Sequence, residues 1–153
     1  MEARAYGRYL EDFVVHAVIK HEVRKTITES DNNLFSLLTM NHHPLHLDGE
    51  YANKSRYGRI LVVGTYVFSL VVGMTVADIS GKAIANLDYD SVTHDAPVFI
   101  GDTIHAETEI LSVRESEHSP DFGIVYVETR TYNQNDLKVL TLRRHILIPK
   151  RGR

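Results

Sequence analysis

The feature that most restricts the fold is a stretch without charges in the middle of the chain, residues 60–77. Its few small or polar positions are Gly64, Thr65, Tyr66, Ser69, Gly73 and Thr75. A helix that is apolar on every side has to be buried, either in a membrane or inside a protein. A membrane span needs about 20 apolar residues, and this stretch is marginal in length. Strand-like segments with alternating polar residues follow it, so we expect a buried helix wrapped by a curved antiparallel sheet.

The size and charge of the chain fit one globular domain over residues 1–153. The net charge of −3 gives no field that would attract nucleic acid or an anionic membrane surface. The absence of cysteine excludes disulfides and thiol catalysis. Charges are scattered through the first residues and leave no apolar core of a signal peptide, so we expect a cytoplasmic protein. Residues 1–16 read as an ordered lead-in, and residues 149–153 as a basic, solvated tail.

The remaining pattern predicts an α+β domain with one sheet. Thr28 to Asp31 resembles a helix start with Ser30 or Asp31 as N-cap, and a helix should run over about residues 31–40. Pro44 should interrupt it within residues 41–48, and one helical turn could follow over residues 49–55. Alternating and β-branched residues predict strands over residues 17–30, 83–94, 103–113, 124–132 and 137–148.

Polar side chains concentrate in residues 31–48, where His42, His43 and His46 lie within five positions. A metal site is the first interpretation to test, but no cysteine or array of carboxylates completes a ligand set. We therefore expect no bound metal. Taken singly, His42 is interpreted as a solvated loop residue or a hydrogen-bonded core residue, whereas for His43 this interpretation and a functional role have equal weight.

The sequence from Asn41 to Asp48, NHHPLHLD, followed by Tyr51 and Ala52, resembles the motif of the MaoC-like (R)-specific enoyl-CoA hydratases. Three other stretches resemble the same family in the same order, namely residues 28–35, 57–64 and 97–103. The resemblance covers about residues 20–148. It implies a hot-dog fold, in which the sheet wraps the central helix.

The resemblance also implies an activity and its partners. The substrate would be an acyl-CoA thioester, and the enzyme would be a lyase of fatty acid metabolism. No separate cofactor would be needed, because CoA is part of the substrate. Members of the family usually form homodimers whose sheets join edge to edge. The acyl-CoA binds near the interface between the two copies.

Hydration of an enoyl thioester needs a base for water, an acid for Cα and donors for the enolate-like oxygen. The resemblance places the catalytic histidine of the family on His46. It places the catalytic aspartate on Asn41 and the asparagine of the motif on His43. An amide has no titratable proton near neutral pH, although it can hold a water molecule. Histidine can serve first as base and then as acid.

Three interpretations follow from the substitution at Asn41. The first, which we favour, makes His46 the sole acid–base group, with Asn41 positioning the water. In the second, His43 or a carboxylate such as Asp31 or Asp48 replaces the lost aspartate. In the third, the protein binds acyl-CoA without catalysis.

The start of the central helix is where an oxyanion donor is expected. Gly64 offers an unpaired N–H at the positive end of the helix dipole, although it could equally serve only close packing, as Gly73 does. His43, Asp31 and Val63 are the predicted substrate-binding residues.

Two other functions on the same fold compete with a hydratase. An acyl-CoA thioesterase would place an acidic residue on or beside the central helix, and residues 60–77 contain none. A non-catalytic acyl-CoA-binding protein is the other alternative, and Asn41 is its main support.

Overall fold

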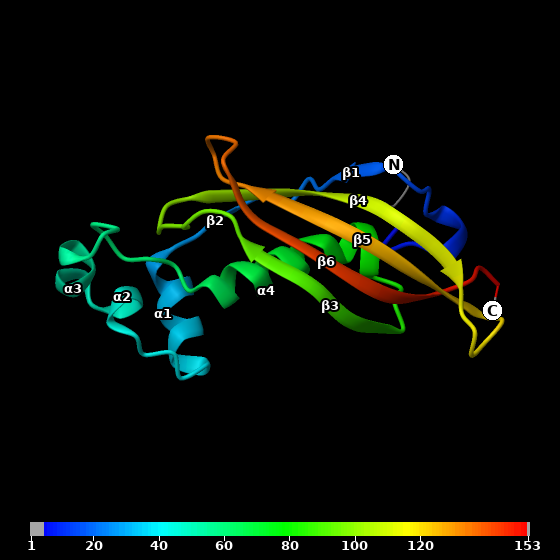
Figure 1. Cartoon of the computed structure of the whole chain (residues 1–153), viewed down its shortest axis with the longest axis horizontal. Helices are drawn as coiled ribbons and strands as arrows, with labels where there is room; N and C mark the ends of the chain where they lie inside the picture. Colours follow the sequence, from blue (N-terminus) through cyan, green and yellow to red (C-terminus); the bar gives the residue numbers. More distant parts are fainter. Residues whose placement is uncertain (1–4, 153) are drawn as a thin grey trace.

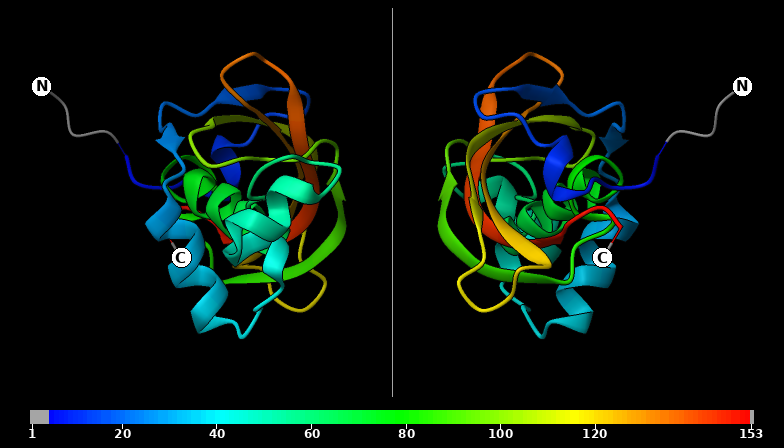
Figure 2. Two further views of the ribbon diagram at one scale, coloured as in Figure 1. Left: turned by 90° about the vertical axis from the view of Figure 1, so that its left-hand side faces the viewer. Right: turned by 90° about the vertical axis from the view of Figure 1, so that its right-hand side faces the viewer.

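The computed structural model describes residues 5–152 of the chain. Its centre is the helix α4 (Gly64–Thr75), which continues directly into a π-helical turn, η2 (Val76–Ser80). The sheet lies along the length of this helix and curves around it (Figure 1). Seen from either end of the molecule, the strands form an arc with α4 inside it (Figure 2). This is the α+β hot-dog arrangement that the resemblance implies.

The sheet is antiparallel, with the strand order β1-β4-β5-β6-β3 and with β2 paired to β4. Its members are β1 (Val18–Lys20), β2 (Lys25–Thr26), β3 (Ala85–His94), β4 (Thr103–Glu115), β5 (Phe122–Tyr132) and β6 (Lys138–Pro149). The four long strands confirm the sequence prediction to within a few residues. The prediction of a single strand over residues 17–30 is wrong. Residues 21–24 are not part of a strand and separate β1 from β2, although His21 N–H still bonds the carbonyl of Ala106 in β4 at 3.0 Å.

Alternation along β4 decides which side chains meet the helix. Ile104, Ala106, Thr108 and Ile110 are buried, as the pattern predicted. The intervening side chains lie on the outer face, where Glu107 and Glu109 both pair with Arg130 of β5. Charge pairing on one face and apolar packing on the other therefore fix the register of these two strands.

The ends of the described chain are tied to the body. Leu10, in the short 3-10 helix η1 (Leu10–Asp12), and Phe13 are buried in the core with Ile79. Residues 5–16 of the predicted lead-in belong to the described part, whereas residues 1–4 lie outside it. In the predicted tail, Arg151 is exposed and its guanidinium pairs with Asp12, and residue 153 lies outside the described part.

The central helix differs from its prediction in two ways. It begins at Gly64 and not at residue 60, because Val62 N–H bonds the carbonyl of Val98 at 2.9 Å and holds the preceding chain extended. It is also not buried on every side, since Thr65, Ser69 and Gly73 form an exposed stripe four residues apart. A Cβ on Gly73 would meet nothing within 4 Å, so close packing inside the chain does not explain this glycine. No helix within residues 5–152 is long and apolar enough to cross a membrane.

Three short helices gather at the end of the sheet where α4 begins (Figure 1). They are α1 (Glu29–Leu38), α2 (Pro44–Leu47) and α3 (Gly49–Lys54). The N-cap of α1 is Thr28 and not Ser30 or Asp31, because Thr28 and Asp31 bond each other's backbone N–H reciprocally. The expected interruption at residues 41–48 contains α2, since Pro44 takes the first helical position, where its missing N–H costs nothing. The turn predicted over residues 49–55 is confirmed as α3.

Candidate functional site

His46 lies on α2 with its ring orientation determined by one hydrogen bond. Nδ1 is 2.7 Å from the carbonyl oxygen of Leu61. A carbonyl oxygen only accepts, so Nδ1 has to carry the proton in this bond. The neutral ring then has its lone pair on Nε2. A histidine held in this tautomer is a ready base at Nε2.

Asn32 of α1 connects His46 to the start of the central helix. Its side chain is fully buried. Nδ2 donates to the carbonyl of His46 at 3.0 Å, and Oδ1 accepts from Val63 N–H at 3.0 Å. One amide therefore sets the position of α2 relative to α4. Sequence reasoning missed Asn32, since an asparagine in a short helix gives no signal that it is buried.

Asn41 and His43 precede His46 in one compact turn. Asn41 Oδ1 accepts from the backbone N–H of His43 at 3.4 Å. His43 is the N-cap of α2, where its Nδ1 accepts from Leu45 N–H at 3.1 Å. Its ring stands edge-on to that of His46, with 6.0 Å between the centroids. The turn thus brings the three predicted residues together on one segment.

Gly64 and Val63 lie at the junction between the extended segment and α4. Gly64 is the first residue of the helix, and its N–H forms no hydrogen bond with any residue of the described part. Such an amide, at the positive end of a helix, suits a developing negative charge. Val63 differs, because its side chain is 1% exposed and its N–H is already bonded to Asn32.

The carboxylates of Asp31 and Asp48 are engaged in helix capping. Asp31 Oδ2 accepts from Thr28 N–H at 2.9 Å and from Lys25 Nζ at 2.9 Å. These bonds hold the pKa of Asp31 below its usual range. Asp48 Oδ1 accepts from two amides at the start of α3. A carboxylate that is stabilised as an anion in this way is a weak base.

A cavity of about 350 Å³ opens beside the start of α4. Its wall includes Leu61, whose carbonyl holds His46, together with Gly64. The polar side chains on the wall are Arg56, Tyr57 and His94. No aspartate or glutamate lines this cavity. Sequence reasoning missed His94, which belongs to β3 and lies far from the histidine cluster in the chain.

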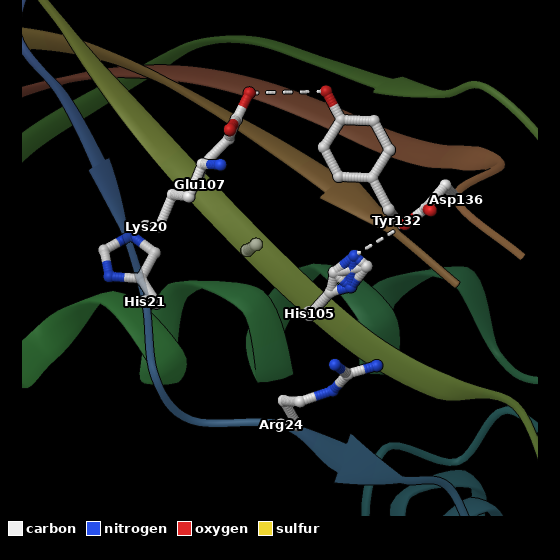
Figure 3. A pocket seen from close by; sticks show the side chains of 8 residues that line it. Lys20, His21, Arg24, His105, Glu107, Tyr132 and Asp136 are labelled. Carbon is white, nitrogen blue, oxygen red and sulfur yellow. Dashed lines mark hydrogen bonds and ion pairs between the residues drawn. The ribbon is translucent and has the colours of Figure 1, made fainter. Parts of the chain in front are cut away.

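A second cavity, of about 380 Å³, lies where residues 21–24 separate β1 from β2 (Figure 3). It contains none of the predicted site residues. The ring of His21 is bonded on both sides, by Asp78 at 2.8 Å and by Thr108 at 2.7 Å. This buried chain joins η2 to β4. Within residues 5–152, no three or more histidine, aspartate or glutamate side chains are grouped as metal ligands.

Comparison with known proteins supports a family assignment. A family model described as a MaoC like domain matches residues 12–132. The chain is 34% identical over 145 residues to a mesaconyl-CoA hydratase of Cereibacter sphaeroides, covering 95% of this chain and 42% of the relative. It is 30% identical over 122 residues to an (R)-specific enoyl-CoA hydratase of Aeromonas caviae, covering 80% of this chain and 87% of that protein. The chain therefore spans about two fifths of the mesaconyl-CoA hydratase and most of the shorter relative.

Solved structures show the same architecture. A monoamine oxidase regulatory protein from Archaeoglobus fulgius superposes with a TM-score of 0.84 at 30% identity, covering 96% of this chain and 97% of that one. A conserved hypothetical protein from Mycobacterium tuberculosis with a double hot-dog fold superposes with a TM-score of 0.87 at 22% identity. The match covers 95% of this chain and 45% of that protein, so the chain corresponds to a single hot-dog.

Proposed function

The chain belongs to the MaoC-like dehydratase family, and on this basis we propose that it adds water reversibly across the 2,3 double bond of an enoyl-CoA. One relative is named a mesaconyl-CoA hydratase and another an (R)-specific enoyl-CoA hydratase, and the second is matched over most of its length. The observation that carries the proposal is the 2.7 Å bond from His46 Nδ1 to the Leu61 carbonyl. It leaves Nε2 of a predicted catalytic histidine as a base.

The proposed reaction starts with water held by the amide of Asn41. Nε2 of His46 takes a proton from this water, and the water oxygen bonds to Cβ of the substrate. The electrons of the double bond move to the thioester oxygen, where the N–H of Gly64 stabilises the negative charge. Protonation of Cα completes the addition. Dehydration uses the same groups in the reverse order.

The cavity wall favours this reaction over thioester hydrolysis. A thioesterase of the kind considered above needs a carboxylate near the central helix. The wall of the 350 Å³ cavity has none, and α4 has none either. Asp78, just beyond α4, is instead bonded to His21.

We also infer that the protein acts as a homodimer through the free edge of β3. This strand ends the sheet and is exposed along its whole length. Three of its exposed side chains are nevertheless apolar, namely Leu87, Tyr89 and Val92, and Ile84 just before the strand is exposed as well. An open, apolar sheet edge is a template for pairing with another chain. Pairing of two such edges would extend one sheet across both copies.

The test is a spectrophotometric hydration assay. Purified protein is offered trans-2-enoyl-CoAs of several chain lengths and a branched, carboxylated one, while the absorbance of the conjugated thioester is followed. We expect turnover that falls by about 10²–10⁴-fold in His46→Ala, the range typical of a lost acid–base group.

The matched control is His42→Ala, which removes an exposed histidine from the same turn. It should keep the wild-type rate. Absence of turnover on every thioester, with CoA esters still bound in calorimetry, would instead identify an acyl-CoA-binding protein. Equal rates in the two variants would remove His46 from the mechanism.

A further inference from the structure

We propose that His94 is a second acid–base residue of this site and delivers the proton to Cα of the substrate. The inference rests on the proposed hydratase function. It starts from an unusual contact between two residues far apart in the chain. His94 is the last residue of β3, and its ring lies against Gly64 at the start of α4.

The contact is close enough to explain why residue 64 is glycine. A Cβ built on Gly64 would lie 2.9 Å from Cε1 of His94 and 3.1 Å from Nε2. Real Cβ atoms do not approach other atoms so closely. The imidazole therefore occupies the space that any side chain at position 64 would need.

The ring of His94 is also free to exchange a proton. Neither nitrogen bonds any residue of the described part, whereas His46 is bonded through Nδ1 and His21 through both ring nitrogens. The adjacent Asp95 accepts from the hydroxyl of Thr141 at 2.7 Å. His94 thus lines the cavity as an imidazole without a structural partner.

The proposed reaction does not yet name the group that protonates Cα, and His46 could do so only by giving up the proton that it has just taken from water. His46 removes a proton from water, and Asn41 cannot supply one to Cα because an amide does not titrate near neutral pH. A thioester oxygen bonded to Gly64 N–H places Cα only two bonds from that oxygen. The side chain that packs on Gly64 is therefore beside Cα.

Two histidines in different protonation states allow the two proton transfers to balance. His94 begins protonated and His46 neutral. Water loses a proton to His46 Nε2 as its oxygen bonds to Cβ, and the double-bond electrons move to the thioester oxygen. As the carbonyl re-forms, Cα takes the Nε2 proton of His94. Proton exchange through solvent then returns His46 to its neutral form and His94 to its protonated form.

The first test is His94→Phe, which retains a ring over Gly64 but cannot transfer a proton. We expect kcat to fall by about 10²-fold or more while KM changes little. The thermal unfolding midpoint should remain near that of the wild type. The control is His118→Phe, at an exposed position outside the cavity, which should keep full activity.

The second test is chemical rescue. His94→Ala leaves a gap beside Gly64 that free imidazole can enter, and we expect added imidazole to restore part of the lost kcat. A purely structural role would not respond in this way. Loss of activity without rescue would overturn the inference.

The outcomes separate this inference from the function on which it rests. Wild-type turnover that disappears in His46→Ala but survives in His94→Phe leaves the hydratase in place and removes His94 from the mechanism. Absence of wild-type turnover on every enoyl-CoA overturns both. Strong loss in both variants, with imidazole rescue of His94→Ala, supports both.

Discussion

At the scale of single residues, hydrogen bonding decides what each histidine can do. Of the nine histidines, His21 uses both ring nitrogens in a buried chain and serves the fold. His46 uses one nitrogen and keeps the other for chemistry. His94 uses neither with any described residue. The same side chain thus takes three roles, because its partners differ.

Asn32 contacts no substrate in the proposed mechanism, but we expect its replacement to lower both the stability of the fold and the hydration rate. Replacing it by alanine leaves the Val63 N–H and the His46 carbonyl without their buried partners. Each unsatisfied buried group costs about 1–3 kcal/mol, so the loss of both partners should lower the free energy of unfolding in urea by roughly 2–6 kcal/mol. The hydration rate should fall as well, since α2 loses its tie to α4.

The matched control for this variant is Asn33→Ala. The neighbouring side chain forms no hydrogen bond with the described residues, so its removal should change the free energy of unfolding by less than about 0.5 kcal/mol. Equal stability of the two variants would show that Asn32 does not hold the site together.

At the scale of elements, the start of α1 shows how local chemistry sets helix boundaries. The sequence placed the cap at Ser30 or Asp31, and the structure places it at Thr28. The difference arises because two capping patterns overlap in residues 28–31. Only the reciprocal bonds between Thr28 and Asp31 select one of them.

The cap of α1 makes stability depend on pH. The pKa of Asp31 is lowered chiefly by the bond from Thr28 N–H and further by Lys25. A lowered pKa stabilises the fold fully above the ordinary carboxyl range, and this contribution is lost as pH falls through the lowered value. Asp31→Asn should therefore unfold about 1 kcal/mol more easily at pH 7, with the difference shrinking as the pH falls through the lowered pKa of Asp31.

The measurement is urea unfolding of both proteins between pH 2 and pH 7, values chosen to bracket carboxylate titration. Glu29→Gln, in the same helical turn, is the control and should show a smaller dependence. A difference that stays constant with pH would contradict the assignment of the carboxylate as the capping group.

At the scale of the whole molecule, we propose that the free edge of β3 is where two copies of the chain assemble. We expect light scattering to give twice the mass of one chain. Leu87→Lys should shift the protein toward the monomer, because it puts a charge on the apolar edge that we assign to the interface. Leu137→Lys, at an exposed leucine in the turn before β6, is the control and should leave the mass unchanged. A monomeric wild type would overturn the proposed dimer, and a dimeric Leu87→Lys would place the interface elsewhere.

The sequence by itself determined the class of the fold and one segment of the candidate site. Uncharged residues 60–77 required a helix with a sheet around it, and alternation in residues 103–113 assigned the inner face of β4. The turn from Asn41 to His46 was recognisable because its members lie next to one another in the chain. These are all properties of local spacing.

Only the tertiary structure decided what surrounds that segment. Asn32 reaches His46 and Val63 because α1 folds back onto the start of α4, and His94 meets Gly64 because the last residue of β3 ends beside it. Residues 60–63 are extended and not helical because the carbonyl of Val98, distant in the chain, bonds Val62. Periodicity reports which face of an element is apolar, whereas contacts between distant segments depend on how all the elements pack.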